Sequence, residues 1–327
     1  MIDKEKLCED LTALGIKGGD HVALGMSLGS VGMVSGGPKG FIDALIDVIG
    51  PSGTVMIPTF THAYPLSLVR RRKVPVFRPE ETVCYSGAVA EFIRRDARAI
   101  RSRHPTNSYA AIGDKAGQLL ADHNHQSAAY SPYSRLADIN GKVLIIGLGY
   151  KLVGIRHEAQ AKAGLLSYIP PYSGALFFDD NEMVSVFVRR DPGGCTKRLP
   201  DMIEQLQAAG IVTEGSVGSA KAFVVPANEG LCIMTGLLQR NPERYLCYAA
   251  RCLWCREMER RLGLCPKLSD KRWFQRNRIL RFPLDAYNYV RVKNMSPMTL
   301  GRCLLPRGVE AVILPVAIRR KRQRTSR

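Results

Sequence analysis

The sequence lacks an apolar run long enough to cross a membrane. None of its apolar stretches reaches about 18 residues, whereas a membrane-spanning helix needs about 20. The first residues, Met1 to Lys6, are charged and contain no apolar segment of the kind found in secretory signal peptides. We therefore expect no membrane span and no signal peptide, and we expect the nine cysteines to be reduced thiols in a cytoplasm.

Acidic residues are scarce, but only in one part of the chain. The 327 residues include 47 Lys and Arg against 29 Asp and Glu, a net charge of +18. Residues 1–245 carry 27 basic and 24 acidic residues (+3), whereas residues 246–327 carry 20 and 5 (+15). The basic charge therefore belongs to the last quarter of the chain and says little about what the main part binds.

Most of the chain alternates between strand and helix patterns, and its 46% hydrophobic content is enough for a sizeable core. A hairpin is expected over 176–188 around Asp179-Asp180-Asn181, and residues 62–82, with the basic run 70–73, are expected to form a long surface loop. The remaining segments expected to be strands are 21–24, 54–61, 109–113, 141–149 and 215–225. Those expected to be helices are 3–15, 41–49, 86–95, 115–120, a helix that begins at 131–136, 199–209 and 228–240.

Two turns have residue types that suit phosphate groups. The strand 21–24 runs into a glycine- and serine-rich turn with Gly25, Met26, Ser27, Ser30 and Ser35, and a helix follows. Backbone N–H groups in such a turn and at a helix N-terminus can point at an anion, although a glycine-rich connection can equally be only a tight turn.

The second such turn is basic and rich in hydroxyl groups, and it contains Arg101, Ser102, Arg103 and Ser108. Arginine suits bidentate contact with phosphate, and the alternative is a solvated basic turn. A further candidate segment, His157-Glu158-Ala159-Gln160, follows the buried strand 141–149. It lies just beyond the carboxyl end of that strand, and in open α/β sheets functional sites are found at the carboxyl ends of the strands. His123 and His125 are two residues apart, but no metal partner stands at a recognisable spacing, so a polar loop is expected there.

Taken together and in this order, these motifs resemble the aminoglycoside 3-N-acetyltransferase family, over roughly the first 245 residues. The resemblance also includes Val34 to Pro38, Pro58 to Thr61, Ser131-Pro132 and Gly215 to Ala220. It implies an α/β fold with a central β-sheet and helices on both faces. It also implies a domain at 1–245 that transfers an acetyl group from acetyl-CoA, the co-substrate, to a small-molecule amine such as the 3-amino group of an aminoglycoside or another amino sugar.

The resemblance further implies roles for individual residues. Ser27 and Ser30 match hydroxyls near the cofactor, Arg101 and Ser102 match the pair on the phosphate side, and His157 matches the catalytic histidine. The family usually has His-Ser-Ser at the first turn, where this chain has Gly25-Met26-Ser27.

The family also commonly has His-x-x-Glu, whereas Gln160 stands three residues after His157 and Glu158 is adjacent to it. We expect His157 to be the general base that accepts the amine proton. Either Glu158 or Gln160 would orient its ring. Backbone N–H groups of the turn from Gly25 to Ser30 would lie near the thioester oxygen.

The acceptor site and the end of the chain are less defined. Acidic residues at 179, 180, 182 and 191 could face a polycationic amine or simply form a turn. Residues 246–327 are expected to be a basic, mostly helical extension with a disordered tail, and nucleic acid could bind only there. This leaves the alternative of an acetyltransferase-like binding protein with weakened activity.

The extension also contains a cysteine run, Cys247, Cys252, Cys255 and Cys265. Its spacing is not that of two close zinc-binding pairs. Because Tyr245 to Leu262 is typical of one helix, these cysteines are expected to pack as small apolar residues without a metal.

Overall fold

The computed structural model describes residues 1–149, 153–166, 173–190, 193–249 and 252–264. The chain forms two compact units, Met1–Met258 and Glu259–Arg327, and nearly all of the second lies outside the described residues. Residues 246–258, expected in the C-terminal extension, belong to the first unit. The division near residue 245 into a transferase domain and an extension stays a prediction.

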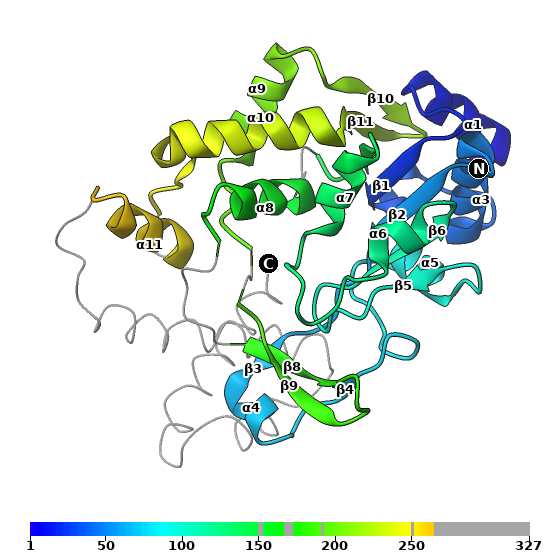
Figure 1. The fold of residues 1–327 in the computed structure, drawn as a ribbon. Helices are drawn as coiled ribbons and strands as arrows, with labels where there is room; N and C mark the ends of the chain where they lie inside the picture. Colours follow the sequence, from blue (N-terminus) through cyan, green and yellow to red (C-terminus); the bar gives the residue numbers. More distant parts are fainter. Residues whose placement is uncertain (150–152, 167–172, 191–192, 250–251, 265–327) are drawn as a thin grey trace, which may run out of the picture. The chain divides into compact units, whose positions relative to one another are not determined.

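A seven-stranded sheet forms the centre of the first unit, in the order β10-β11-β7-β1-β2-β6-β5 (Figure 1). The inner strands β7, β1 and β2 run parallel, and every other pairing is antiparallel. The carboxyl ends of the three parallel strands therefore meet at one edge. The strands are β1 (His21–Met26), β2 (Thr54–Pro58), β5 (Ile100–Arg101), β6 (Tyr109–Gly113), β7 (Lys142–Ile146), β10 (Thr213–Val217) and β11 (Ala220–Pro226).

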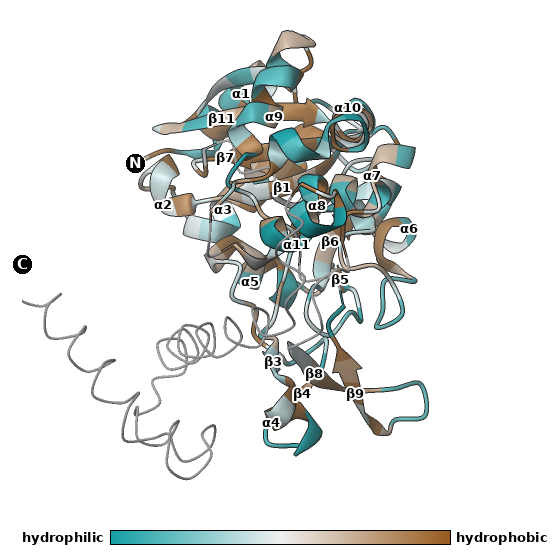
Figure 2. Ribbon diagram, turned by 90° about the vertical axis from the view of Figure 1, so that its left-hand side faces the viewer, coloured by the Kyte–Doolittle hydropathy of each residue, from teal (hydrophilic) through white to brown (hydrophobic). Residues whose placement is uncertain are grey.

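Helices cover both faces of this sheet. Figure 2 shows β1 and β7 between α3 on one side and α7 and α10 on the other. A single apolar cluster joins α1, α3 and α5 to the sheet, and α10 packs against α7 and α8 on the opposite face. This confirms the α/β fold expected from the sequence. The helices are α1 (Lys4–Ala13), α2 (Leu28–Val31), α3 (Gly37–Ile49), α5 (Ala88–Arg95), α6 (Ala116–Leu120), α7 (Pro132–Asp138), α8 (Val153–Lys162), α9 (Leu199–Ala208) and α10 (Ala227–Arg240).

The helix starts follow local chemistry. Asp3 caps α1 by accepting a hydrogen bond from the Lys6 N–H at 2.9 Å. Leu7 and Leu11, one turn apart on α1, are fully buried. Pro38 stands in the first turn of α3, where its missing N–H costs nothing. The helices α1 and α3 pack against the sheet, and the first glycine-rich turn lies between β1 and α3.

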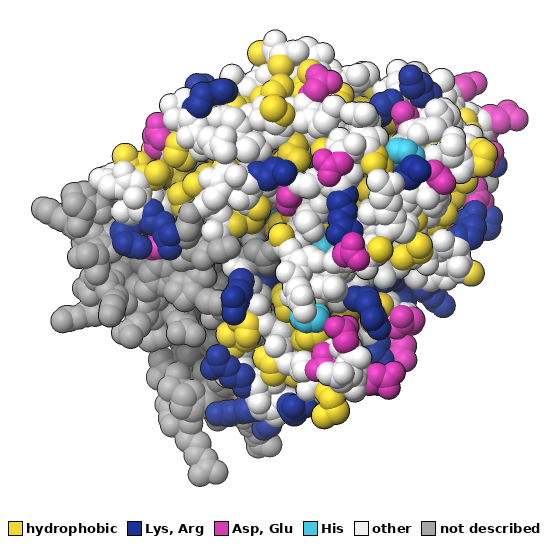
Figure 3. Space-filling view, viewed as in Figure 1, with side chains coloured by type: hydrophobic (Ala, Val, Ile, Leu, Met, Phe, Trp, Pro, Cys, Tyr) yellow, Lys and Arg dark blue, Asp and Glu magenta, His cyan; other side chains and the backbone are white. Residues whose placement is uncertain are grey.

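A second, smaller sheet corrects the expected long loop at 62–82. It contains β3 (Tyr64–Pro65), β8 (Ser173–Phe178) and β4 (Val76–Phe77), and β9 (Val184–Val188) pairs with β8 as the expected hairpin. The short helix α4 (Leu66–Arg70) lies beside it. Elements of two to five residues have no measurable period, so the sequence did not predict them. The basic run at 70–73 is exposed, and Figure 3 shows basic side chains gathered in this part of the molecule.

The segment after α10 also differs from expectation. A short 3-10 helix, η1 (Pro242–Tyr245), ends before an irregular stretch, and the helix α11 (Leu253–Arg261) begins later. Tyr248 has a positive φ of 50°, which interrupts a helix. The single helix predicted from Tyr245 to Leu262 is therefore wrong. Within the described residues, no helix has the length and apolar character needed to cross a membrane.

Candidate active site

The imidazole of His157 lies on α8, the helix that follows β7. Its side chain is buried, with 5% of its surface exposed. The ring packs on Tyr130 with a centroid distance of 4.8 Å, and Tyr130 in turn contacts Phe60, just beyond the carboxyl end of β2. His157 is thus linked through packed rings to the edge where the parallel strands end.

Two polar groups, Gln160 Oε1 and the Gly194 N–H, contact His157 Nδ1. Gln160 Oε1 lies 2.7 Å from His157 Nδ1, and Gln160 Nε2 donates to the carbonyl of Cys195 at 3.4 Å. The Gly194 N–H donates to Gln160 Oε1 at 3.2 Å and to His157 Nδ1 at 3.1 Å. Gln160 Oε1 can only accept, so its contact needs a proton on Nδ1, whereas the Gly194 N–H needs a lone pair on the same atom. We assign the proton to Nδ1 because its contact with Oε1 is the shorter of the two, and this assignment leaves the lone pair of the imidazole on Nε2.

Burial keeps this imidazole neutral. Loss of solvation lowers the pKa of His157 to about 4, the hydrogen bond to Gln160 opposes the shift, and the charges of Arg156 and Arg189 add to it. At neutral pH the ring is therefore uncharged and ready to accept a proton.

Gly193 lies close to the other ring nitrogen of His157, Nε2. A Cβ at this position would lie 2.8 Å from His157 Nε2 and 2.8 Å from the Tyr130 hydroxyl oxygen. Gly193 also has a positive φ of 82°, which favours glycine. Any side chain at residue 193 would therefore collide with His157 Nε2 and with the Tyr130 hydroxyl.

Of the two residues expected to orient His157, the structure brings Gln160 to Nδ1. Glu158 is buried and accepts a hydrogen bond at 2.5 Å from Ser134 Oγ on α7. It therefore joins α8 to α7. Tyr130 and the Gly194 N–H were missed by the sequence reasoning, because they come from segments far from His157 and carry no local signal.

The basic turn that contains Arg101 forms hydrogen bonds with neighbouring segments of the protein. Arg101 donates to the carbonyls of Thr59, Pro79 and Thr82 at 2.6–2.9 Å, and its Nε lies 3.2 Å from both Thr59 Oγ1 and Ser108 Oγ. Burial lowers the pKa of Arg101 to about 10, so the guanidinium is still charged at neutral pH. These contacts use four of its five N–H groups. Most donors of Arg101 are used inside the protein, and its expected contact with a phosphate stays a prediction.

The hydroxyl groups of the two serines in this turn are also hydrogen-bonded within the protein. Ser102 Oγ accepts from the Tyr109 N–H at 2.9 Å and lies 3.0 Å from His123 Nδ1. Ser108 Oγ donates to the Thr59 carbonyl at 2.7 Å. Both serines are buried, and their expected contact with a cofactor stays a prediction. Arg103 is exposed and stays a candidate for phosphate contact.

The first turn keeps its hydroxyl groups near the carboxyl ends of β1 and β7. Ser30 Oγ lies 2.9 Å from Ser27 Oγ and 3.3 Å from the Gly147 carbonyl. The Ser27 and Ser30 N–H groups donate to the carbonyls of Ile146 and Ser27, so these two are not available to a thioester oxygen. Gly25 and Met26 end β1, and Ser35 is exposed just before α3.

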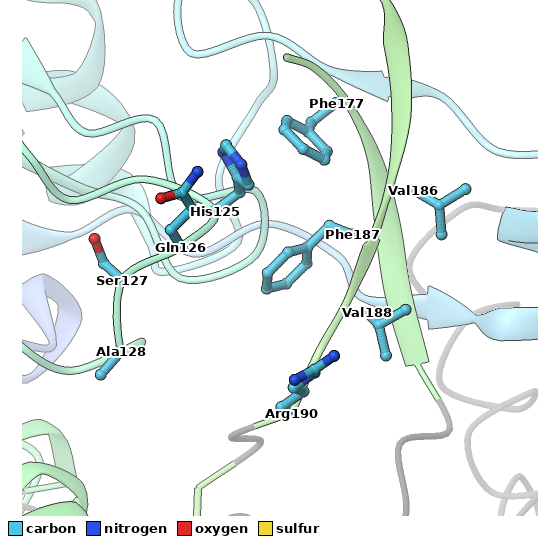
Figure 4. A pocket seen from close by; sticks show the side chains of 9 residues that line it. All are labelled: His125, Gln126, Ser127, Ala128, Phe177, Val186, Phe187, Val188 and Arg190. Atoms are coloured by element: carbon cyan, nitrogen blue, oxygen red, sulfur yellow. The ribbon is translucent and has the colours of Figure 1, made fainter. Parts of the chain in front are cut away.

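An open cleft of about 550 Å³ lies between the loop 125–128 and the β8–β9 hairpin (Figure 4). Phe177, Phe187 and His125 face one another in it, and Arg190 lies at its lower end. None of the described residues that line it is acidic. Asp179, considered for amine binding, instead accepts from the N–H groups of Asn181 and Met183 and from Ser185 Oγ, which makes it a turn residue. Asp191 lies outside the described residues.

Comparison with known protein families shows which family this chain resembles. The model of the family described as aminoglycoside 3-N-acetyltransferase matches residues 24–239. The chain belongs to this family. It is 31% identical over 255 residues to aminoglycoside N(3)-acetyltransferase VII of Streptomyces paromomycinus, which covers 70% of this chain and 88% of the relative. It is 33% identical over 180 residues to aminoglycoside N(3)-acetyltransferase IX of Micromonospora chalcea, which covers 51% of this chain and 64% of that relative.

Solved structures agree with this assignment. The fold matches AAC-IIIb in its binary complex with CoASH with a TM-score of 0.67 and 26% identity, over 73% of this chain and 97% of the other. It matches AAC-VIa bound to sisomicin with a TM-score of 0.65 and 27% identity, over 73% and 97%. The chain is therefore an acyltransferase of this family with acetyl-CoA as co-substrate, as the sequence predicted. These comparisons lend no support to the alternative of a binding protein with weakened activity.

Proposed function

We propose that this acyltransferase acetylates the 3-amino group of an aminoglycoside, with His157 as the general base. The observation that carries the assignment of the base is the buried imidazole whose Nδ1 lies 2.7 Å from Gln160 Oε1 and whose Nε2 lies beside Gly193. The names of the relatives supply the acceptor class, and the sisomicin complex of AAC-VIa shows such an amine bound to a relative.

In the proposed reaction, the amine nitrogen attacks the carbonyl carbon of the acetyl thioester. The new C–N bond forms, the C–S bond breaks, and coenzyme A leaves as a thiolate that takes its proton from the His157 imidazolium, which returns the base to its neutral form. The amine proton passes to His157 Nε2 as the nitrogen becomes acidic in the tetrahedral intermediate. Such proton transfer typically contributes about 10²–10⁴-fold to the rate. The Gln160 amide oxygen steadies the imidazolium through a neutral hydrogen bond, in place of the carboxylate found in the family pattern.

We place acetyl-CoA at the edge formed by the carboxyl ends of β1 and β7. The Ser27 and Ser30 hydroxyls lie there, and Ser35 precedes the N-terminus of α3, where the helix dipole favours an anion. Exposed Arg103 would reach a phosphate from the other side of the site. We also place the reaction in the cytoplasm, where acetyl-CoA is made; the unpaired thiols of the described residues are compatible with this compartment.

The test is to offer the protein acetyl-CoA with a panel of aminoglycosides and simple amino sugars. Turnover is measured by release of the coenzyme A thiol, and the acetylated position of each product is determined by NMR. The proposal predicts a single acetyl group on the 3-nitrogen of the aminoglycosides. A product acetylated at another nitrogen, or turnover only with simple amino sugars, would contradict the acceptor assignment. It would not affect the assignment of His157 as the base, which is tested separately with His157 variants.

A further inference from the structure

Four cysteines from distant parts of the chain meet beside α8. Cys195 follows the β8–β9 hairpin, Cys247 follows η1, and Cys252 and Cys255 stand at the start of α11. Their Sγ atoms all lie within 4.8 Å of one another, and all four residues are free of disulfides. Cys195 was not part of the cysteine run singled out in the sequence. Cys265, expected as the fourth member, lies outside the described residues.

The distances suit a tetrahedral thiolate complex. Four sulfur atoms bound to zinc at about 2.3 Å are separated from one another by about 3.8 Å in a tetrahedron. The largest separation among the gathered Sγ atoms, at most 4.8 Å, exceeds that value by no more than about 1 Å. Cys252 and Cys255 supply the close pair of the C-x2-C spacing that such sites commonly use.

Backbone N–H groups point at two of the sulfurs. The Cys247 N–H donates to Cys255 Sγ at 3.2 Å, and the Lys197 N–H donates to Cys195 Sγ at 3.5 Å. Donors of this kind stabilise thiolates and orient them toward a metal. Trp254, between the members of the close pair, is buried and donates its indole N–H to the Leu165 carbonyl at 3.2 Å, which anchors this segment on the chain after α8.

The charges around the cluster give a second, independent indication. Arg156 on α8 is fully buried, and it donates from Nη1 to the Cys195 carbonyl. Within the described part of the chain, no carboxylate lies at ion-pair distance from Arg156. A buried guanidinium without a counter-charge is costly. Four thiolates around a divalent ion carry a net charge of −2, which supplies the missing negative charge beside Arg156.

We propose that Cys195, Cys247, Cys252 and Cys255 bind one structural zinc ion. A tetrahedral set of four thiolates favours zinc among common divalent metals, and a site with four protein ligands has no open position for catalysis. This reverses the expectation that the cysteines only pack as small apolar residues.

The site has a consequence for the active site. The Cys195 carbonyl accepts from Arg156 and Gln160, and the neighbouring Gly194 N–H lies 3.2 Å from Gln160 Oε1. The ion therefore holds the loop 193–195 against α8. In this way the zinc positions the amide that orients His157.

The proposal is tested on the full chain, purified from zinc-supplemented medium without chelators. Elemental analysis should give close to one zinc per chain, and the cobalt-substituted protein should show the intense visible bands of tetrahedral cobalt thiolate. Cys252→Ser should lower the zinc content at least fivefold. Cys232→Ser, which changes an exposed cysteine outside the cluster, should leave it unchanged.

The measurements on the unmodified chain keep the test independent of whether a variant folds. X-ray absorption at the zinc edge should show four sulfur neighbours. Less than a tenth of a zinc per chain, a shell with nitrogen or oxygen neighbours, or disulfides among these four cysteines in protein purified under reducing conditions would each overturn the proposal.

Discussion

The hydrogen bond between Gln160 and His157 allows a sharp prediction about pH dependence. Replacing Gln160 by Glu puts a carboxylate 2.7 Å from Nδ1, in the position of the amide oxygen. A charge pair about 4 Å apart interacts by about 4 kcal/mol at an effective dielectric constant of about 20. Since one pKa unit corresponds to about 1.4 kcal/mol, the ceiling of the shift is about 3 units, and pairs of this kind commonly give about 1–3.

Gln160→Glu should therefore raise the pKa of His157 from about 4 to between about 5 and 7. Because the neutral imidazole is the active form, the acid limb of the kcat/KM profile should move to higher pH by the same amount. The profile is measured by thiol release, and the pKa is measured directly by NMR titration of the ring.

Gln160→Ala is the matched control. It removes the hydrogen bond that raises the pKa of His157, so the acid limb should stay or move to lower pH while kcat falls. An acid limb that does not move in Gln160→Glu would refute the claim that this contact controls the protonation of the base.

Three further predictions concern stability and access to the site. His104, His123 and His157 are buried, and burial lowers their pKa values below 6.5 in the folded chain. As the pH falls below about 6.5, the unfolded chain takes up protons at these histidines before the folded chain does, so the free energy of unfolding decreases. His157 alone accounts for a loss of about 3 kcal/mol by pH 4. Melting temperatures that are level between pH 7.5 and 5 would contradict this. Gly193→Ala would push a methyl group against Nε2, so kcat should fall at least tenfold with little change in acetyl-CoA affinity measured by calorimetry; normal kcat would show that Nε2 does not take part in the reaction. Arg101→Ala should destabilise the fold by roughly 3 kcal/mol or more in urea unfolding, through lost hydrogen bonds to the neighbouring segments. If that variant instead keeps its stability and loses only acetyl-CoA binding, the structural role is wrong.

The long elements of the fold could be predicted from the sequence because each has a local signal. The buried strand β7 is a continuous apolar run between glycines, and α3 has a proline in its first turn with apolar residues on one face. The small sheet had no such signal, since β3 and β4 have two residues each and gain stability only by pairing with β8, about 100 residues away. Long-range pairing of short segments cannot be inferred from periodicity.

The candidate site was predictable only in part, for a related reason. His157 and Gln160 share one turn of α8, so their contact follows from helical spacing. Arg101 has the residue type of a phosphate ligand, but its guanidinium is used by three backbone carbonyls of its own protein. Residue type shows what a side chain can bind, whereas tertiary contacts decide what remains free to bind. Cys195 likewise joins the other cysteines only through the fold.

The role of His157 is tested most directly by comparing turnover and acetyl-CoA binding in the unmodified chain and in His157→Ala. If His157 is the base, acetyl-CoA affinity measured by calorimetry is unchanged in the variant, while kcat with an aminoglycoside falls at least a hundredfold, which corresponds to about 2.7 kcal/mol in the barrier. Equal turnover in the two proteins would contradict the assignment of His157 as the base.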